Sequence, residues 1–502
     1  MTGPQPRAAK PVHVFDRNVE WERLASFSAS PAPRAMLGVV SGRRRMGKTF
    51  LLRALVEQQG GFYFGATAAT EGESLRQFGA ALARHAGSPV SFSFASWDDA
   101  ITYLFDLAVP GRVTQPFLVV IDEFPYLAKA VPELPSIIQR EIDRFQVTES
   151  RMRLLLCGSA MSVMGRLLAS AAPLRGRAQL ELIVRPFDYR SAAIFWGAAD
   201  QPALAVRLHA VLGGTPAYRR QFLAEDVPVG LDDFGDWLCR TVLSPLSPLF
   251  REARYLLAEE ADIRDTALYH SVLAAVAEGN ATRGGIASYI GRKSVDISHP
   301  LNVLEDSHLL VREPDMFRAG KSHYRIAEPL INFYEAVMRP SWARLESGQA
   351  RDVWAQAEPR FAAQVAGPHF EAICREFMRG PGRSLVGGHP GRVGSGVVAD
   401  HAGRQQIEID IAVAEDGSGG SKASVAMLGE AKWGTAMGLP HLERLLRARG
   451  LLADRGTDVS QCVLACFSTA GFSEALRAEA DRGGVLLLGL AYLYQGSQPL
   501  AH

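Results

Sequence analysis

The sequence predicts an α/β protein whose N-terminal part is built on a parallel β-sheet, and three observations lead to this prediction. Residues 36–158 alternate short apolar runs with stretches of helical periodicity, as a parallel sheet with crossover helices requires. The run AMLGVVSG leads through a glycine-framed turn into the amphipathic stretch KTFLLRALVEQQG. Three later apolar runs, GFYFGAT, PFLVVIDEF and RMRLLLCGSA, complete a set of four expected strands.

The chain is too long for a single hydrophobic core, because 502 residues exceed the usual size of one domain. The proline- and serine-rich stretch LSPLSPLF interrupts a helical region and marks a boundary. The predicted division is a core over 1–185, a helical lid and linker over 186–262, a helix–hairpin domain over 263–340, a linker over 341–357 and a second α/β domain over 358–502.

Composition excludes several classes of protein. A net charge of +1 gives no global attraction to nucleic acid or anionic membranes. No apolar run reaches the ~18–20 residues that span a bilayer. The five cysteines are too scattered for a disulfide framework or a paired zinc site, and we expect Cys462 and Cys466, which lie in an apolar run, to be buried thiols. We therefore expect a cytoplasmic protein without a membrane partner.

The segment Gly42-x4-Gly47-Lys48-Thr49 has the spacing of a phosphate-binding loop between a strand and a helix. Glycines allow backbone N–H groups to curl around a phosphate, and the helix that follows presents its positive end. Lys48 can reach the β- and γ-phosphates of ATP, and the Thr49 hydroxyl can ligate Mg²⁺. We also count Arg43 and Phe50, within and directly after the loop, among the nucleotide-binding residues.

Asp122 and Glu123 end the apolar strand FLVVIDEF, about 75 residues after the loop. In this arrangement the aspartate holds Mg²⁺ and the glutamate polarises the attacking water. An isolated Asp-Glu pair is more often structural or a helix cap. Together with the loop, the pair predicts a site for hydrolysis of Mg-ATP.

Further candidates have structural alternatives of equal weight. Ser159, after RMRLLLC, can sense the γ-phosphate or cap a helix. Arg175 and Arg177 can complete the site in the same chain or in a neighbouring subunit, or lie in solvent. We expect the arginines at 43–45 mostly to face solvent or acidic neighbours, with one touching the nucleotide.

Residues 268–329 have the spacing of a winged helix, with three helices followed by a hairpin whose tip, FRAGKSH, is basic. We expect Pro300 to kink the long third helix, SVDISHPLNVLEDSHLL, or to shift its start. This helix carries Asp296, Glu305 and Asp306 and no arginine to read guanine. DNA binding and protein packing therefore remain equal alternatives for this domain.

Acidic residues mark the second half of the chain. Glu371 lies in a helical stretch, and Asp410 and Glu430 fall on consecutive strands joined by the turn EDGSGGSKAS. Hairpin pairing can bring these two side by side, with Lys432 on the same face as Glu430. Clustered carboxylates imply a divalent cation, and a lysine beside them can stabilise a phosphoryl transition state. The alternative is an ordinary solvated strand edge.

Several motifs resemble the archaeal-type ATPases of the AAA-like P-loop class, in the order seen in that family: FDRNVEWERL, VVSGRRRMGKTFLL, IDEFPYL, CGSA, PLRGRA and GGTPAY. This resemblance covers the first half of the chain and implies that Phe15 and Arg17 lie near the adenine. Residues 408–433 resemble the DUF234-like domain that often follows these ATPases. That domain is similar to the PD-(D/E)XK nucleases, with a D…ExK layout.

Three functions are compatible with these patterns. The first is an Mg-ATP-hydrolysing enzyme coupled to DNA binding by the winged helix and to metal-dependent DNA cleavage. The second is an ATP-switched regulator that binds DNA or protein, alone or as an oligomer, and cuts nothing. The third is a scaffold without hydrolysis, against which Glu123 counts. The fold predicted for the whole chain is a P-loop NTPase parallel sheet with a helical lid, a winged helix and a C-terminal α/β restriction-endonuclease-like domain.

Overall fold

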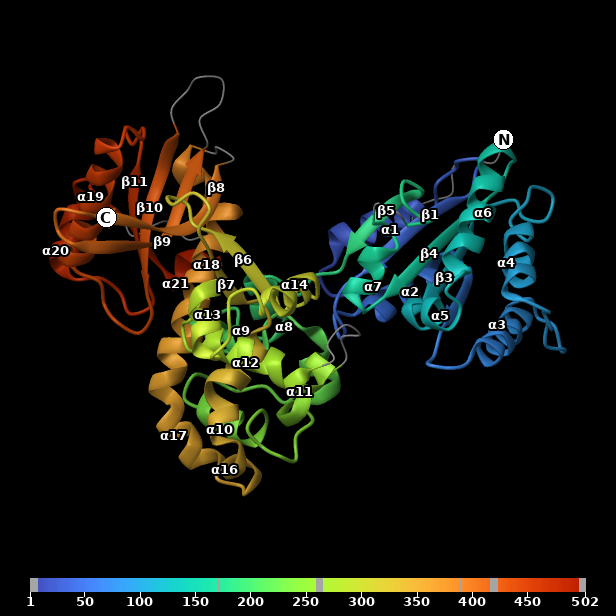
Figure 1. Cartoon of the computed structure of the whole chain (residues 1–502), viewed down its shortest axis with the longest axis horizontal. Helices are drawn as coiled ribbons and strands as arrows, with labels where there is room; N and C mark the ends of the chain where they lie inside the picture. Colours follow the sequence, from blue (N-terminus) through green and yellow to red (C-terminus); the bar gives the residue numbers. More distant parts are fainter. Residues whose placement is uncertain (1–7, 170–171, 259–264, 388–390, 416–422, 496–502) are drawn as a thin grey trace. The chain divides into compact units, whose positions relative to one another are not determined.

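The computed structural model describes residues 8–169, 172–258, 265–387, 391–415 and 423–495. The chain folds as two compact units (Figure 1). The first comprises Met1–Pro186 with Thr215–Ala217, and the second comprises Phe187–Gly214, Tyr218–Ala258 and Asp265–His502. The finer division into domains stays a prediction.

The first unit contains a parallel sheet of five strands in the order β2-β3-β4-β1-β5 (Figure 1). Its strands are β1 (Met36–Ser41), β2 (Phe62–Gly65), β3 (Phe117–Asp122), β4 (Met152–Gly158) and β5 (Ala178–Ile183). The first four lie where the sequence predicts them. We did not predict β5, an edge strand whose side chains alternate between half-buried and exposed.

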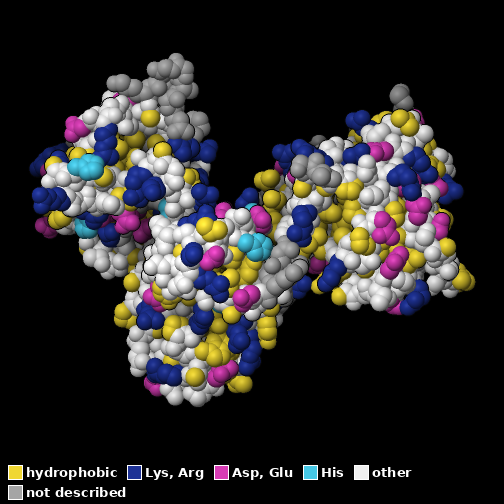
Figure 2. Space-filling view, viewed as in Figure 1, with side chains coloured by type: hydrophobic (Ala, Val, Ile, Leu, Met, Phe, Trp, Pro, Cys, Tyr) yellow, Lys and Arg dark blue, Asp and Glu magenta, His cyan; other side chains and the backbone are white. Residues whose placement is uncertain are grey.

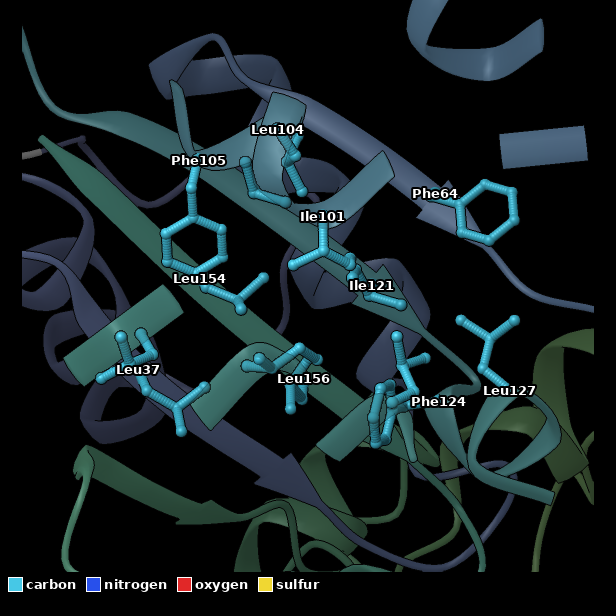
Figure 3. Close-up of a cluster of buried hydrophobic side chains, with 14 of the residues drawn as sticks. Leu37, Phe64, Ile101, Leu104, Phe105, Ile121, Phe124, Leu127, Leu154 and Leu156 are labelled. Atoms are coloured by element: carbon cyan, nitrogen blue, oxygen red, sulfur yellow. The ribbon is translucent and has the colours of Figure 1, made fainter. Parts of the chain in front are cut away.

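Apolar side chains cover both faces of this sheet, as expected of a parallel sheet with crossover helices. On β4, Leu154 and Leu156 point into a cluster with Phe105 and Phe124 (Figure 3). Leu155, between them, packs in the opposite cluster against α1 and α2. The helices of this unit are α1 (Asn18–Ser28), α2 (Lys48–Gln59), α3 (Glu71–His85), α4 (Trp97–Asp106), α5 (Phe124–Ala130), α6 (Leu134–Val147) and α7 (Met161–Arg166).

The helices expected to form a lid pack within the second unit. They are α8 (Tyr189–Phe195), α9 (Pro202–Leu212), η1 (Tyr218–Phe222), α10 (Phe234–Arg240) and α11 (Leu249–Ala258). The most extensive contacts of α9 are with α15 (Pro329–Phe333) and α8. The proline-rich stretch before α11 therefore lies inside the second unit and not at its edge.

Three helices and an antiparallel hairpin follow in the predicted order: α12 (Thr266–Ala277), α13 (Arg283–Tyr289), α14 (Ser298–Asp306), β6 (Leu310–Pro314) and β7 (Ser322–Ile326). The third helix is shorter than expected, because it begins only at Ser298 and places Pro300 in its first turn. Proline is tolerated there since the first N–H groups of a helix have no partner within it. The predicted shift of the helix start is thus confirmed.

The hairpin tip is packed against a strand of the C-terminal sheet. The Met316 N–H donates to the Ser395 carbonyl at 3.1 Å, on β8 (Arg392–Asp400). A Cβ at Gly394 would come within 2.8 Å of the Met316 sulfur, and one at Gly396 would meet Phe317. The two glycines therefore permit a close approach that larger residues would block.

The C-terminal sheet is mixed, in the order β12-β11-β10-β9-β8. Its strands after β8 are β9 (Gln405–Glu415), β10 (Ser424–Lys432), β11 (Val463–Ser468) and β12 (Leu486–Gly489). These four match the prediction, whereas the glycine-containing β8 was missed. The predicted turn EDGSGGSKAS lies mostly outside the described residues, but its flanking strands pair in the expected antiparallel sense.

Helices cover both faces of the C-terminal sheet. Phe370 and Phe377 of α18 (Gly367–Arg379) pack on one side, together with α21 (Leu490–Gln495). Leu442 and Leu445 of α19 (Leu439–Asp454) pack on the other, together with α20 (Glu474–Asp481). The segment before them contains η2 (Tyr334–Met338), η3 (Arg339–Ser341), α16 (Trp342–Glu346), α17 (Ala350–Arg360) and η4 (Phe361–Ala366), and η5 (Pro381–Val386) follows α18.

A buried ion-pair network joins the hairpin to this sheet. Glu313 of β6 accepts from Arg325 at 3.0 Å and from His323 at 3.1 Å, and Arg375 of α18 lies 3.7 Å away. Burial alone would raise the pKa of Glu313, but its three basic neighbours outweigh burial and hold that pKa well below its usual range. The carboxylate is therefore fixed in its charged form.

No described helix is both long and apolar enough to cross a bilayer. Figure 2 shows Lys and Arg side chains interspersed with Asp and Glu over the visible face. This mixture agrees with the net charge of +1.

Replacing Arg375, which is 3% exposed, with Ala should lower the free energy of unfolding of the second unit by about 1.5–3 kcal/mol, since it removes a buried cation beside Glu313, which still keeps Arg325 and His323. The pKa of Glu313 is lower in the folded state than in the unfolded chain. Its ion pairs therefore contribute stability above about pH 4.5, and this contribution is lost as the pH falls. The loss in Arg375→Ala should therefore be smaller at pH 4 than at pH 7.

Urea denaturation followed by hydrogen exchange of the β6 and α18 peptides measures this loss. Arg482→Ala, which breaks the exposed pair with Glu479, is the control and should cost no more than about 1 kcal/mol. Equal losses in the two variants would contradict a buried network.

Candidate functional site

The predicted phosphate loop connects β1 to α2 in a conformation that depends on its two glycines. Gly42 has φ 151° and Gly47 has φ 85°, both in the region that favours glycine. A Cβ at Gly42 would also lie 2.4 Å from the Val184 carbonyl oxygen. The loop ends at Lys48, the first residue of α2, so the positive end of that helix opens onto the loop.

The Lys48 side chain closes the loop. Its ammonium group donates to the carbonyls of Gly42 at 2.6 Å and Arg43 at 2.8 Å. The residue is only 5% exposed, and burial lowers the pKa of its ammonium group despite nearby acidic groups. A phosphate entering the loop would offer this buried cation a stronger, charged acceptor than the two carbonyls.

Asp122, at the end of β3, is joined to the loop helix by hydrogen bonds. The hydroxyls of Thr49 and Tyr63 both donate to Asp122 Oδ2 at 2.7 Å. Burial alone would raise the pKa of Asp122, but bonds from Thr49, Tyr63 and the Cys157 thiol outweigh burial and lower it. The Thr49 hydroxyl and the ionised carboxylate are hard oxygen donors, which fit Mg²⁺.

Glu123 follows in a left-handed conformation, with φ 52°. This conformation is rare for glutamate and is found mostly at functional sites. The Ser159 hydroxyl, just after β4, lies 3.2 and 3.1 Å from the two carboxylate oxygens of Glu123 and donates to them. Ser159 therefore holds Glu123 instead of capping α7, whose N-cap is Ala160.

The residues expected near the adenine or directly after the loop lie in different environments. Arg17 is 7% exposed, and its guanidinium donates to the Met46 and Arg185 carbonyls, so it supports the loop. Phe50 is 45% exposed and meets the ring of His13 edge-on. Phe15 is half-buried. Their contact with adenine stays a prediction.

Of the loop arginines, Arg43 does not face solvent, because it is only 9% exposed. The prediction that one of these arginines touches the nucleotide stays a prediction. Arg44 is half-buried and donates to the Tyr126 hydroxyl at 3.0 Å.

Arg177 pairs with a carboxylate on α6. It forms a two-point ion pair with Asp143 of α6, at 2.7 and 2.8 Å, and donates to the Pro173 carbonyl. The bonds from Arg177 lower the pKa of Asp143. In this conformation Arg177 is occupied by a carboxylate of its own unit, and its role in ATP hydrolysis stays a prediction.

In the second unit, α18 and β9 bring Glu371 and Asp410 close together. Burial and the charge of Asp410 raise the pKa of Glu371 to about 8, and burial also raises the pKa of Asp410. Arg375 lies 3.8 Å from Glu371 and donates to the Asp410 main-chain carbonyl at 3.0 Å. Burial and the closeness of the two carboxyl groups therefore disfavour the charged form of this pair.

Glu430 is held separately. Lys432 and Arg444 of α19 lie 3.2 and 3.1 Å from the same Glu430 oxygen. Asp410 Oδ2 accepts the Ala431 N–H at 2.9 Å, which confirms that β9 and β10 bring Asp410 beside the Glu430 strand. Among the described residues, however, no group of three or more His, Cys, Asp or Glu is arranged to hold a metal ion. The ligand set Glu371, Asp410 and Glu430 is therefore not assembled in this conformation, and its metal role stays a prediction.

Sequence reasoning missed Tyr63, Arg375 and Arg444. Tyr63 reaches Asp122 only because β2 pairs with β3, and no motif signals that pairing. The two arginines lie on helices whose packing against the sheet is a tertiary property.

Solved structures show a general likeness. A Walker-type ATPase of Pyrococcus abyssi is 20% identical with a TM-score of 0.48, over 66% of this chain and 98% of that one. The ORC2 protein of Aeropyrum pernix is 17% identical with a TM-score of 0.40, over 70% and 96%.

Sequence comparison covers a similar share of the chain. An uncharacterized protein of Methanocaldococcus jannaschii is 28% identical over 344 residues, which is 68% of this chain and 72% of that protein. Residues 14–202 match the sequence model of a family described as an ATPase domain predominantly from Archaea. The N-terminal part of the chain therefore carries an archaeal-type ATPase domain.

Proposed function

We propose that the protein binds Mg-ATP between the loop over residues 42–49 and the end of β3, and hydrolyses it there. The observation that carries this proposal is the 2.7 Å bond between the Thr49 hydroxyl and Asp122. It brings together the two predicted Mg²⁺ ligands from segments 73 residues apart. Bound Mg²⁺ would offset the charge of the phosphate oxygens.

The residues of the chain would act in a defined order. Lys48 exchanges its two carbonyl partners for phosphate oxygens, since charged acceptors bind an ammonium more strongly. Glu123 orients the attacking water and accepts its proton. Ser159 keeps the Glu123 carboxylate in place, which limits the orientations that the base can adopt.

A test of this proposal uses two variants with different expected defects. Lys48→Ala should weaken ATP binding about 10- to 100-fold, because charged hydrogen bonds to the phosphates are lost. Glu123→Gln should retain ATP binding while hydrolysis falls about 10²- to 10⁴-fold, because the general base is removed. Calorimetry measures binding, and phosphate release measures hydrolysis.

Glu149→Gln, on an exposed loop of the same unit, is the matched control and should behave as wild type. If Glu123→Gln hydrolyses ATP at the wild-type rate, the assigned base is wrong. If the wild-type chain takes up no ATP, the proposed site is wrong.

A second candidate function is metal-dependent cleavage of DNA by the C-terminal domain. The half-buried pair Glu371 and Asp410 favours it, because two neighbouring carboxylates can together bind a divalent cation. Glu430 would become the third ligand of the cation, which would replace Lys432 and Arg444 as the partner of its carboxylate. Lys432 would then be free to stabilise charge on a phosphoryl group.

DNA binding would use the helices before the hairpin and not its tip. Arg318 is paired with Asp315, and Met316 is held against β8, so the tip has another partner. Arg292 and Lys293, between α13 and α14, are exposed. The competing proposal is an ATP-switched regulator in which this domain packs against protein.

A nicking assay on supercoiled DNA distinguishes the nuclease from the regulator. With Mg²⁺ or Mn²⁺, the wild-type chain should nick the DNA, Asp410→Ala should not, and Glu443→Gln on exposed α19 should match wild type. ATP hydrolysis is measured in parallel, with and without DNA. Intact DNA beside normal ATP hydrolysis in the wild type would reject the nuclease and favour the regulator.

A further inference from the structure

A cavity of about 570 Å³ opens in the second unit between α11, α12 and the segment η2–η3. This volume lies within the range of small-molecule sites, about 300–1,000 Å³. None of its lining residues belongs to the phosphate loop or the C-terminal acidic pair. The cavity is therefore separate from the proposed ATP site and from the proposed metal site.

The described lining residues include three arginines and no acidic residue. Arg251 and Arg254 come from one face of α11, and Arg339 comes from the start of η3. Arg251 and Arg254 are exposed, and neither forms an ion pair or hydrogen bond with any part of the chain that the structure describes. Their N–H groups are therefore available to a ligand.

Aromatic rings hold Arg254 in place. Its guanidinium carbon lies 5.2 Å from the ring centre of Trp342, which itself stacks on Phe250 at 4.3 Å. A guanidinium that rests on a ring keeps its N–H edges free and loses less freedom when it binds an anion.

A buried carboxylate lies behind two of the lining residues. Glu335, whose side chain is fully buried, lies 2.7 Å from His270 Nδ1 and 2.8 Å from Arg339. It fixes both lining groups but cancels only one positive charge. Among the described residues, the three guanidinium groups of the cavity have only this one carboxylate as an ion-pair partner.

The rim adds an aromatic surface. Tyr255 is 51% exposed and lines the cavity one residue after Arg254, and Tyr334 lies at its base. Arginines beside an accessible ring are the combination that binds a nucleotide, since the arginines take the phosphate and the ring stacks on the base.

We propose that this cavity is a second nucleotide site, which takes a phosphate-bearing nucleotide unit, either free or within a single strand. Arg251 and Arg254 bind the phosphate, Arg339 and His270 are held behind it by Glu335, and Tyr255 stacks on the base. The proposal does not rest on ATP hydrolysis.

The test uses the full-length chain with Lys48→Ala, so that the phosphate loop contributes little. One arm measures binding of a fluorescein-labelled oligothymidylate by anisotropy, and the other measures thymidine 5′-monophosphate by calorimetry. Adding Arg251→Ala and Arg254→Ala together should weaken binding about tenfold or more, since charged hydrogen bonds to phosphate are lost. Arg254→Lys should recover part of the loss because it restores the charge.

Arg351→Ala is the matched control, because it removes an equally exposed positive charge on α17 of the same unit. Binding of the oligonucleotide alone identifies a strand as the ligand, and binding of the monophosphate identifies a free nucleotide. If neither probe binds, or if Arg351→Ala loses as much as the double variant, the proposal is wrong. Should the double variant fail to fold, a tenfold loss in Arg251→Ala alone supports the site and wild-type affinity overturns it.

Discussion

The N-terminal unit depends on one short connection, the hydrogen bond from Thr49 to Asp122. It fixes the first turn of α2 against the end of β3, although the chain between them includes two helices and a strand. Tyr63 donates a second hydrogen bond to the same oxygen. These bonds lower the pKa of Asp122, so the carboxylate stays ionised although it is buried. Glu123 can then adopt its rare left-handed conformation next to a rigid neighbour.

Local signals in the sequence predicted the parts of the fold that local physics determines. Four strands of the first sheet are continuous apolar runs, and the loop glycines have the conformations that their spacing requires. Pro300 shifted the start of α14 for a purely local steric reason. The edge strands β5 and β8 were missed because a strand that is exposed on one side, or rich in glycine, carries no apolar run.

In the candidate sites, too, local sequence patterns predicted some residues, whereas contacts set by tertiary packing were missed. Lys48, Thr49, Asp122 and Glu123 were predicted from their spacing, and the structure brings them together. The partners of Ser159 and Arg177, and the contact of Glu430 with Arg444, were not predicted, because each is set by packing between different elements of the chain. Glu371 and Asp410 do converge, but Arg444 reaches Glu430 from a helix that no motif connects with the acidic strands.

The docking of the hairpin tip onto β8 has a practical consequence for dissecting the chain. A fragment ending in the stretch before α18 would lose β8 and Arg375 together. Met316 and Phe317 would then meet water, and Glu313 would keep only the partners on its own hairpin. If the helix–hairpin segment were expressed by itself, these apolar side chains would be exposed and would favour aggregation. A recombinant fragment should therefore contain both the helices after residue 265 and the C-terminal sheet.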